Sequence, residues 1–135
     1  ILDLLREIQA EAGMAMVLIS HDLGVVADLC TRVGVMYAGR LVEMAPAAEL
    51  FAEPQHPYTC GLLGALPDMS GPRRRLVAIP GSVPEPGRLP AGCAFAPRCG
   101  FATAACAAGV PELEAVGEDH HAACARLPLP DAAAA

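Results

Sequence analysis

Two groups of residues in this chain have the types and the spacing to take part in chemistry. The first is the triplet Ser20, His21 and Asp22, which directly follows a short apolar run. The second is a set of four residues near the end of the chain, called here the tail cysteines: Cys93, Cys99, Cys106 and Cys124. Imidazole can accept a hydrogen bond from an attacking water or donate one to a phosphate oxygen, and cysteine thiolates can hold zinc or an iron–sulfur cluster.

The elements around the triplet place it at the end of a predicted strand. Residues 14–19 form a continuous apolar run of strand length, which is typical of a strand covered on both faces. Residues 22–30 then return to helical spacing. The carboxyl end of such a strand is where open α/β sheets bind their ligands. On the pattern alone a second interpretation stays open, in which Ser20 or Asp22 caps the helix and His21 is a partly buried structural residue.

The rest of the first half is predicted to alternate between helices and strands. In chain order we expect a helix over 1–12, strands over 32–37 and 40–44 joined by a tight turn at Ala38 and Gly39, and helices over 46–51 and 56–66. Pro46 and Pro57 suit the first turns of the last two helices. His56 is expected at the start of the second of these, and Cys30 and Cys60 are expected in helix core. The predicted fold class is therefore α/β.

From residue 67 onward the composition changes. Repeated proline and glycine predict an extended connector over 67–92, and the run Arg73, Arg74 and Arg75 within it is expected to be a solvated face. The predicted organisation is an α/β part over 1–66, that connector, a small loop-rich cysteine-containing extension over 93–127 and a disordered tail over 128–135. Few large apolar residues lie between the tail cysteines, so a stabilising cross-link such as a bound metal is physically plausible.

The spacing of the tail cysteines, C-x5-C-x6-C-x17-C, does not match a common metal motif. It lacks the close pairs of a zinc knuckle and the tight run of bacterial ferredoxins. Four loop ligands could still converge, since a five-residue spacer reaches roughly 17 Å. Arg98 and Arg126 adjoin two of these cysteines, where positive charge would favour thiolates. Without a secretory signal in the sequence, such clustering favours metal or cluster ligation over disulfides.

Charge and hydropathy exclude some classes of function. A net charge of −6 argues against a nucleic-acid-binding surface. The acidic residues near the tail cysteines are expected to be surface residues: Glu112, Glu114, Glu118 and Asp119. The apolar run over 14–19 is far shorter than the roughly 20 residues of a membrane helix, so we expect no transmembrane segment in this chain. We expect a protein that is soluble or attached to a membrane through a partner.

The first half of the chain resembles a known family. The stretches GMAMVLISHDLGVVADLCTRVGVMYAGRLVEMAPAAELF and HPYTCGLL resemble the end of the ABC ATPases that serve oligopeptide and dipeptide importers. The resemblance implies that residues 1–66 are the C-terminal part of an ABC-type (P-loop NTPase) nucleotide-binding domain. It also implies that His21 is the switch histidine that contacts the γ-phosphate, and that ATP and Mg²⁺ are cofactors of the intact protein.

The tail extends the resemblance. The segments GCAFAPRCGFATAACAAGVPEL and HHAACARLP resemble the C-terminal extension of peptide-importer ATPases, in some members of which four cysteines hold a [4Fe–4S] cluster. All four tail cysteines match that pattern, which implies a structural cluster, because ATP-driven transport needs no redox step. Two alternatives stay open: a structural zinc ion, with His120 or His121 replacing a cysteine, and four reduced thiols that pack as small hydrophobes.

The sequence also lacks parts that ATP hydrolysis requires. It contains no G-x-x-x-x-G-K-[ST] loop and no lysine at all, so we expect a fragment that cannot hydrolyse ATP alone. The resemblance implies a parent protein on the cytoplasmic face of the membrane. Its implied partners are a second ATPase subunit, two permeases and an external peptide-binding protein. The alternative is a stand-alone iron–sulfur or zinc interaction module. Dipeptide, oligopeptide and nickel-complex importers are not distinguished.

Overall fold

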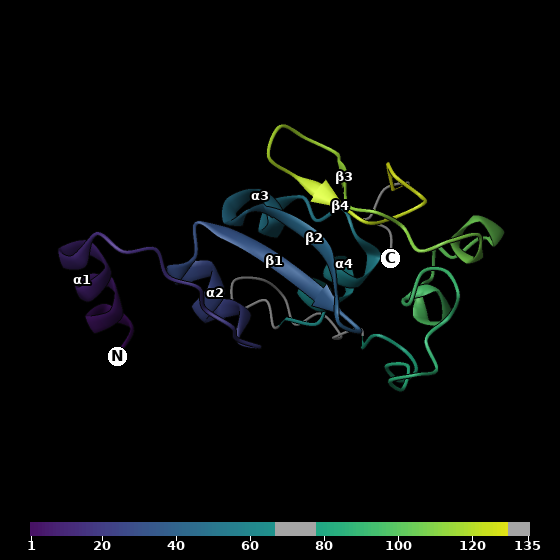
Figure 1. The fold of residues 1–135 in the computed structure, drawn as a ribbon, viewed down its shortest axis with the longest axis horizontal. Helices are drawn as coiled ribbons and strands as arrows, with labels where there is room; N and C mark the ends of the chain where they lie inside the picture. The colour runs from purple at the N-terminus through teal and green to yellow at the C-terminus, as the bar shows by residue number, and fades with distance from the viewer. Residues whose placement is uncertain (67–77, 130–135) are drawn as a thin grey trace, which may run out of the picture.

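The computed structural model describes residues 1–66 and 78–129 (Figure 1). A four-stranded antiparallel sheet in the order β1-β2-β4-β3 lies at its centre. Helices α2, α3 and α4 lie around the β1–β2 hairpin, and two 3₁₀ turns lie in the cysteine-containing segment. The predicted Arg73–Arg75 run and most of the predicted tail over 128–135 lie outside the described residues. The fold is thus a small mixed domain of helices and antiparallel sheet.

The predicted hairpin is confirmed. Strand β1 (Arg32–Tyr37) alternates exposed and buried residues, and it pairs antiparallel with β2 (Arg40–Pro46). The turn has positive φ at both central residues, 48° at Ala38 and 78° at Gly39. Positive φ at both positions gives a turn whose twist matches the two strands, and glycine adopts it without strain.

The cysteine-containing segment contributes two strands that the sequence pattern did not indicate. Strand β4 (His121–Ala122) pairs with β2, and β3 (Glu114–Ala115) pairs with β4. The register places Ala122 opposite Glu43 and His121 opposite Met44. The segment therefore continues the sheet of the first half of the chain.

The helices begin within one residue of the predicted positions, and Pro46, predicted in the first turn of its helix, instead ends β2. Helix α2 (Leu23–Leu29) begins after Asp22, α3 (Ala47–Ala52) after Pro46, and α4 (Pro57–Gly64) after His56. The His56 ring caps α4, because its Nδ1 accepts a hydrogen bond of 3.1 Å from the backbone N–H of Tyr58. The cysteine-containing segment adds the 3₁₀ turns η1 (Ala96–Arg98) and η2 (Ala104–Ala107).

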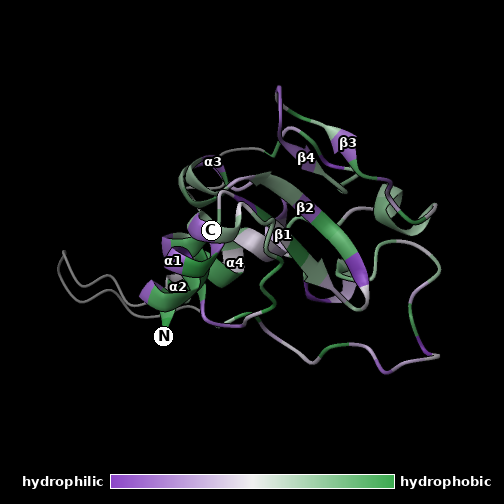
Figure 2. Ribbon diagram, turned by 60° about the vertical axis from the view of Figure 1, so that its left-hand side comes forward, coloured by the Kyte–Doolittle hydropathy of each residue, from purple (hydrophilic) through white to green (hydrophobic). Residues whose placement is uncertain are grey.

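The predicted strand over 14–19 is wrong for this chain. Helix α1 (Leu2–Ala12) ends at Gly13 as expected, but residues 14–20 pair with no strand of the described residues. The side chains of Val17 and Ile19 are 90% and 95% exposed. A strand covered on both faces needs a hydrogen-bonded neighbour and helices above and below it, and the described residues place none there. In Figure 1, α1 stands apart from the sheet, and in Figure 2 its surface mixes apolar and polar residues.

The core joins the hairpin to the cysteine-containing segment. Its buried apolar residues are Val26, Val33, Val35, Tyr37, Val42, Ala45, Ala47, Leu50 and Phe95. The Phe95 ring lies 5.2 Å from that of Tyr37 and 5.4 Å from that of Tyr58, measured between centroids. Aromatic rings at such separations attract one another beyond the area they bury. Phe95 therefore anchors the loop between Cys93 and Cys99 on the sheet.

Candidate functional site

The triplet forms a well-defined helix start. An Asp22 carboxylate oxygen accepts hydrogen bonds from the backbone N–H groups of Gly24 and Val25, at 2.9 and 3.2 Å. Ser20 Oγ in turn accepts the N–H of Asp22 at 3.0 Å. The predicted capping role of Asp22 is confirmed. His21 lies between these two anchored residues with its side chain exposed, so the local structure presents the imidazole outward.

The tail cysteines lie on loops that approach one another. The backbone N–H of Cys93 donates to the carbonyl oxygen of Cys106 at 2.8 Å. A Cβ added at Gly92 would lie 2.1 Å from that oxygen, so only glycine permits this approach. All four are free thiols, Cys106 buried and the others half-buried. Within residues 1–66 and 78–129, no three His, Cys, Asp or Glu side chains stand close enough to hold a metal ion.

Electrostatics nevertheless link the four thiols. Burial raises the pKa of Cys99, and the negative charges that Cys93 and Cys106 would carry as thiolates raise that pKa further. Burial likewise raises the pKa of Cys124, with added contributions from Cys99, Cys93 and Cys106. Thiolates influence one another in this way only when they are near neighbours in a poorly hydrated region. Metal ligation by Cys99 or Cys124 must therefore displace a proton at neutral pH.

The two arginines near the tail cysteines have different surroundings. Arg98 donates to the carbonyl oxygens of Pro80 and Ile79, at 2.7 and 3.2 Å, and to the Tyr37 hydroxyl at 3.3 Å. Arg126 lowers the pKa of Cys99 against the larger effect of burial. Its buried Nε has no hydrogen-bond partner among the described residues. An anionic metal site formed by thiolates would offer an acceptor to this unpaired N–H group. The four thiols and Arg126 therefore have the chemistry that a thiolate-bound metal or cluster requires.

The two histidines offered as replacement zinc ligands have different surroundings. His120 is buried, and its Nε2 lies 2.7 Å from Glu43 Oε1. His121 is half-buried, and its Nδ1 has no hydrogen-bond partner within the described part of the chain. In the zinc alternative, His120 would bind the metal through Nδ1 while its Nε2 kept the contact with Glu43.

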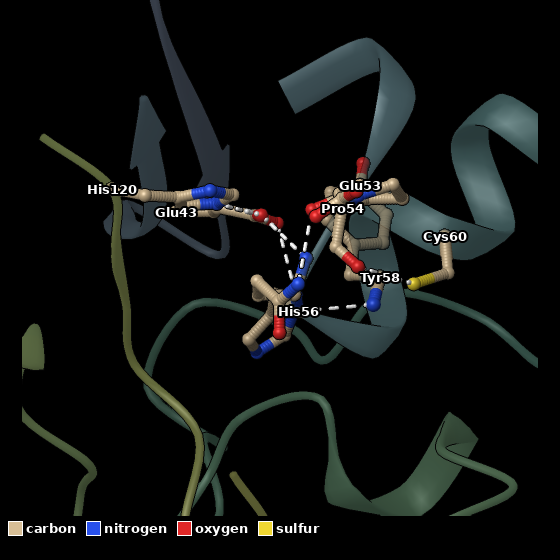
Figure 3. A network of polar contacts seen from close by, with 8 residues as sticks. Glu43, Glu53, Pro54, His56, Tyr58, Cys60 and His120 are labelled. Atoms are coloured by element: carbon tan, nitrogen blue, oxygen red, sulfur yellow. Dashed lines mark hydrogen bonds and ion pairs between the residues drawn. The ribbon is translucent and has the colours of Figure 1, made fainter. Parts of the chain in front are cut away.

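Glu43 is the central residue of a buried polar network that the sequence analysis did not identify (Figure 3). Its carboxylate is completely buried. Oε1 accepts from the backbone N–H of Gln55 at 2.6 Å and contacts His120, while Oε2 accepts from the N–H of His56 at 3.0 Å. A buried carboxylate is stabilised only by such donors. The signal available in the sequence was a glutamate at an inward position of an otherwise apolar strand.

The network also surrounds a buried neutral histidine. Burial lowers the pKa of His56 to about 4, against the opposing effect of the Glu43 carboxylate. Burial raises the pKa of Cys60, in the same helix, to about 11, and this thiol lies 3.5 Å from the carbonyl oxygen of Pro54. Cys99 and Cys124 also act on the pKa of Cys60. Cys60 and Gly61 of α4 also line one pocket with Phe95, so α4 lies beside the loop that carries Cys93 and Cys99.

The pKa of His56 predicts acid sensitivity. The unfolded chain protonates His56 below a pKa of 6.5, whereas the folded chain does so only near 4. The unfolded state therefore binds more protons between these values, and the free energy of unfolding should fall as the pH falls through this window, by roughly 3 kcal/mol. Urea unfolding at several pH values measures it. His56→Asn keeps a capping oxygen and should flatten this dependence, whereas exposed His21→Asn should not. Equal pH dependence in all three proteins would contradict the assignment.

Comparisons with known proteins place these features in a family. Residues 42–106 match the family described as "Oligopeptide/dipeptide transporter, C-terminal region". The chain is 52% identical over 132 residues to peptide import ATP-binding proteins of Brucella ovis and Brucella abortus, and 49% identical over 128 residues to another from Brucella abortus. These alignments cover 93% and 95% of this chain and 39% of each relative's length.

The matched residues contain much of the site described above. The range 42–106 includes Glu43, the α4 helix with its HPYT start, and three of the tail cysteines. Among the described residues no helix combines the length and apolar character needed to cross a membrane. Residues 42–106 therefore carry the oligopeptide/dipeptide transporter C-terminal region, and nearly the whole chain aligns with proteins named as peptide import ATP-binding proteins.

Proposed function

We propose that the chain is the C-terminal part of an ATP-binding subunit of an ABC importer that couples ATP hydrolysis to peptide uptake. The observation that carries the proposal is the 52% identity, over 93% of the chain, to proteins named as peptide import ATP-binding proteins. The chain spans about two fifths of the length of these relatives, so the phosphate loop and Mg²⁺ ligands would come from residues outside it.

In this proposal His21 contacts the γ-phosphate of ATP. The support is local: Asp22 and Ser20 hold the turn before α2, and the imidazole between them is exposed. A histidine held in this way can orient an attacking water or donate to a phosphate oxygen without losing stabilising contacts. Residues 14–19, apolar and exposed here, would be covered by the remainder of the nucleotide-binding domain.

The proposal includes the partners of a complete importer. A second ATPase subunit, two membrane permeases and an external peptide-binding protein would work with this subunit on the cytoplasmic face of the membrane. The support is the wording of the relatives' names, which couple peptide import to ATP binding. The discriminating observation is the reading frame upstream of Ile1. A phosphate loop and signature motif there support the proposal, whereas a start codon at this point favours a stand-alone metal-binding module.

We also propose that the tail cysteines hold a [4Fe–4S] cluster with a structural role. Their mutual electrostatic influence, the unpaired Arg126 Nε and the resemblance to cluster-containing extensions support this assignment. A bound cluster would link four loop positions covalently through iron. Because the described sulfur atoms do not form a ready ligand shell, binding would draw the loops closer together. Burial of Cys99 and Cys124 keeps these thiols protonated without metal, so uptake should strengthen as the pH rises.

Metal analysis of anaerobically purified protein tests the cluster. We expect roughly four iron atoms and a matching amount of acid-labile sulfide per chain, with visible absorbance. Cys99→Ser should lose most of the iron, because one ligand of four is removed. Cys30→Ser, which alters a thiol packed against the core far from the loops in sequence, is the matched control and should keep it. Colourless wild-type protein with one zinc per chain would replace the cluster by the zinc alternative.

A further inference from the structure

The cysteine-containing segment is attached to the sheet through few backbone contacts. Strands β3 and β4 have two residues each, and β4 meets β2 at only two residue pairs. One further backbone bond, 2.8 Å from the N–H of Ala123 to the carbonyl oxygen of Val42, continues this ladder. Ladders this short are marginal by themselves. Another interaction must therefore hold β4 in register.

The Glu43–His120 contact is placed to do this. It joins side chains 77 residues apart in sequence, and these side chains are 0% and 7% exposed. His120 directly precedes β4, and Glu43 lies opposite Ala122 in the register. Since the same carboxylate accepts from the backbone of Gln55 and His56, it connects β2, the start of α4 and β4 at one point (Figure 3).

The position of one tail cysteine depends on that register. Cys124 follows Ala123, whose N–H is bonded to β2, so its sulfur is located by the end of the β4 ladder. Cys93 and Cys99 are located differently, because Phe95 between them is fixed in the aromatic core. Cys106 is tied to Cys93 by a backbone hydrogen bond. A one-residue slip of β4 would turn Cys124 away while leaving the other three in place.

We propose that His120, through its contact with Glu43, is a positioning residue that brings Cys124 to the other three tail cysteines. This inference rests on the proposed four-cysteine site but concerns the metal-free chain as well. The nearest competing connection is the exposed ion pair between Arg32 and Asp119, 3.1 Å apart, which joins β1 to the residue before His120. Exposed pairs of this kind contribute little, so it provides a matched control.

Alkylation of Cys124 in chelator-treated, reduced protein is the first measurement. The rate of iodoacetamide modification, followed by peptide mass spectrometry, reports how often β4 detaches. We expect His120→Leu to raise the rate at Cys124 roughly tenfold or more relative to Cys93, because a hydrogen bond to a buried carboxylate is lost. His120→Gln retains an N–H donor at a similar reach and should restore a rate near that of wild type. Asp119→Asn should leave the rate unchanged.

Metal content is the second measurement, and it separates this inference from the proposed function. If the wild type binds iron or zinc, His120→Leu should retain less of it than Asp119→Asn, with a folded circular dichroism spectrum. If the wild type binds neither metal but Cys124 alkylation responds as expected, the positioning role stands and the cluster proposal fails. If the rate at Cys124 is the same in His120→Leu and wild type, or rises equally in Asp119→Asn, the positioning role is overturned.

Discussion

Replacing Glu43 by glutamine should destabilise the chain by about 3 kcal/mol, although the two side chains have nearly the same shape. Three donors converge on the carboxylate: the backbone N–H groups of Gln55 and His56 and the ring of His120. An amide has one oxygen and one NH₂ group, so in either orientation its NH₂ would face a buried backbone N–H. That donor would lose its partner without water to replace it. Urea unfolding of the wild type and variant measures the change.

The matched control is Glu53→Gln, which makes the same chemical change at an exposed position near the start of α4. Surface substitutions of this kind usually alter stability by less than about 0.5 kcal/mol. A comparable loss in both variants would mean that the carboxylate network is not the cause. A loss below about 1 kcal/mol in Glu43→Gln would show that the amide is accommodated, and the network would then have no special role in stability.

Replacing His21 by alanine should lower ATP turnover about 100-fold or more in the complete ATP-binding subunit, while nucleotide affinity changes little. The imidazole would act on the attacking water and the γ-phosphate, so it affects the transition state more than the bound ground state. Single-turnover hydrolysis and equilibrium binding of a non-hydrolysable ATP analogue measure the two effects separately. The side chain is exposed in this chain, so its removal should not reduce stability here.

Arg40→Ala is the control for this experiment, because it removes another exposed side chain, at the start of β2 beside the hairpin turn. It should leave both turnover and affinity near the wild-type values. If His21→Ala hydrolyses ATP at the wild-type rate, the γ-phosphate role is lost and His21 is only part of the helix start. If affinity falls as much as turnover, the residue contributes to binding and not to the chemical step.

Local interactions explain why much of the first half could be predicted. The hairpin turn at Ala38 and Gly39 depends on backbone conformations that glycine favours, and the start of α2 depends on a carboxylate that reaches N–H groups two and three residues away. The start of α4 likewise depends on neighbouring residues, because the His56 ring accepts the N–H of Tyr58 and Pro57 occupies the first helical position. In each case the interacting groups are close in sequence, so their identities and spacing contain the information.

Expectations failed where the outcome depended on distant partners. Residues 14–19 have the composition of a buried strand, but a strand forms only beside another strand, and none of the described residues pairs with them. Arg98 adjoins Cys99 in sequence, yet its guanidinium is bound by Pro80, Ile79 and Tyr37, and Arg126 acts on Cys99 instead. Sequence position offered both arginines, and only the tertiary structure shows that the Arg98 guanidinium is bound elsewhere.

The amino-acid sequence was enough to identify the candidate chemistry, namely an imidazole at a helix start and four thiols in a segment with little core of its own. It also determined the local elements, because caps and turns act over a few residues. The pairing of β4 with β2, and the position of Glu43 as the buried acceptor shared by α4 and His120, became visible only in the folded chain. The physical reason is that hydrogen bonding and burial between groups 77 residues apart depend on how the whole chain folds, and composition and periodicity do not encode those pairings.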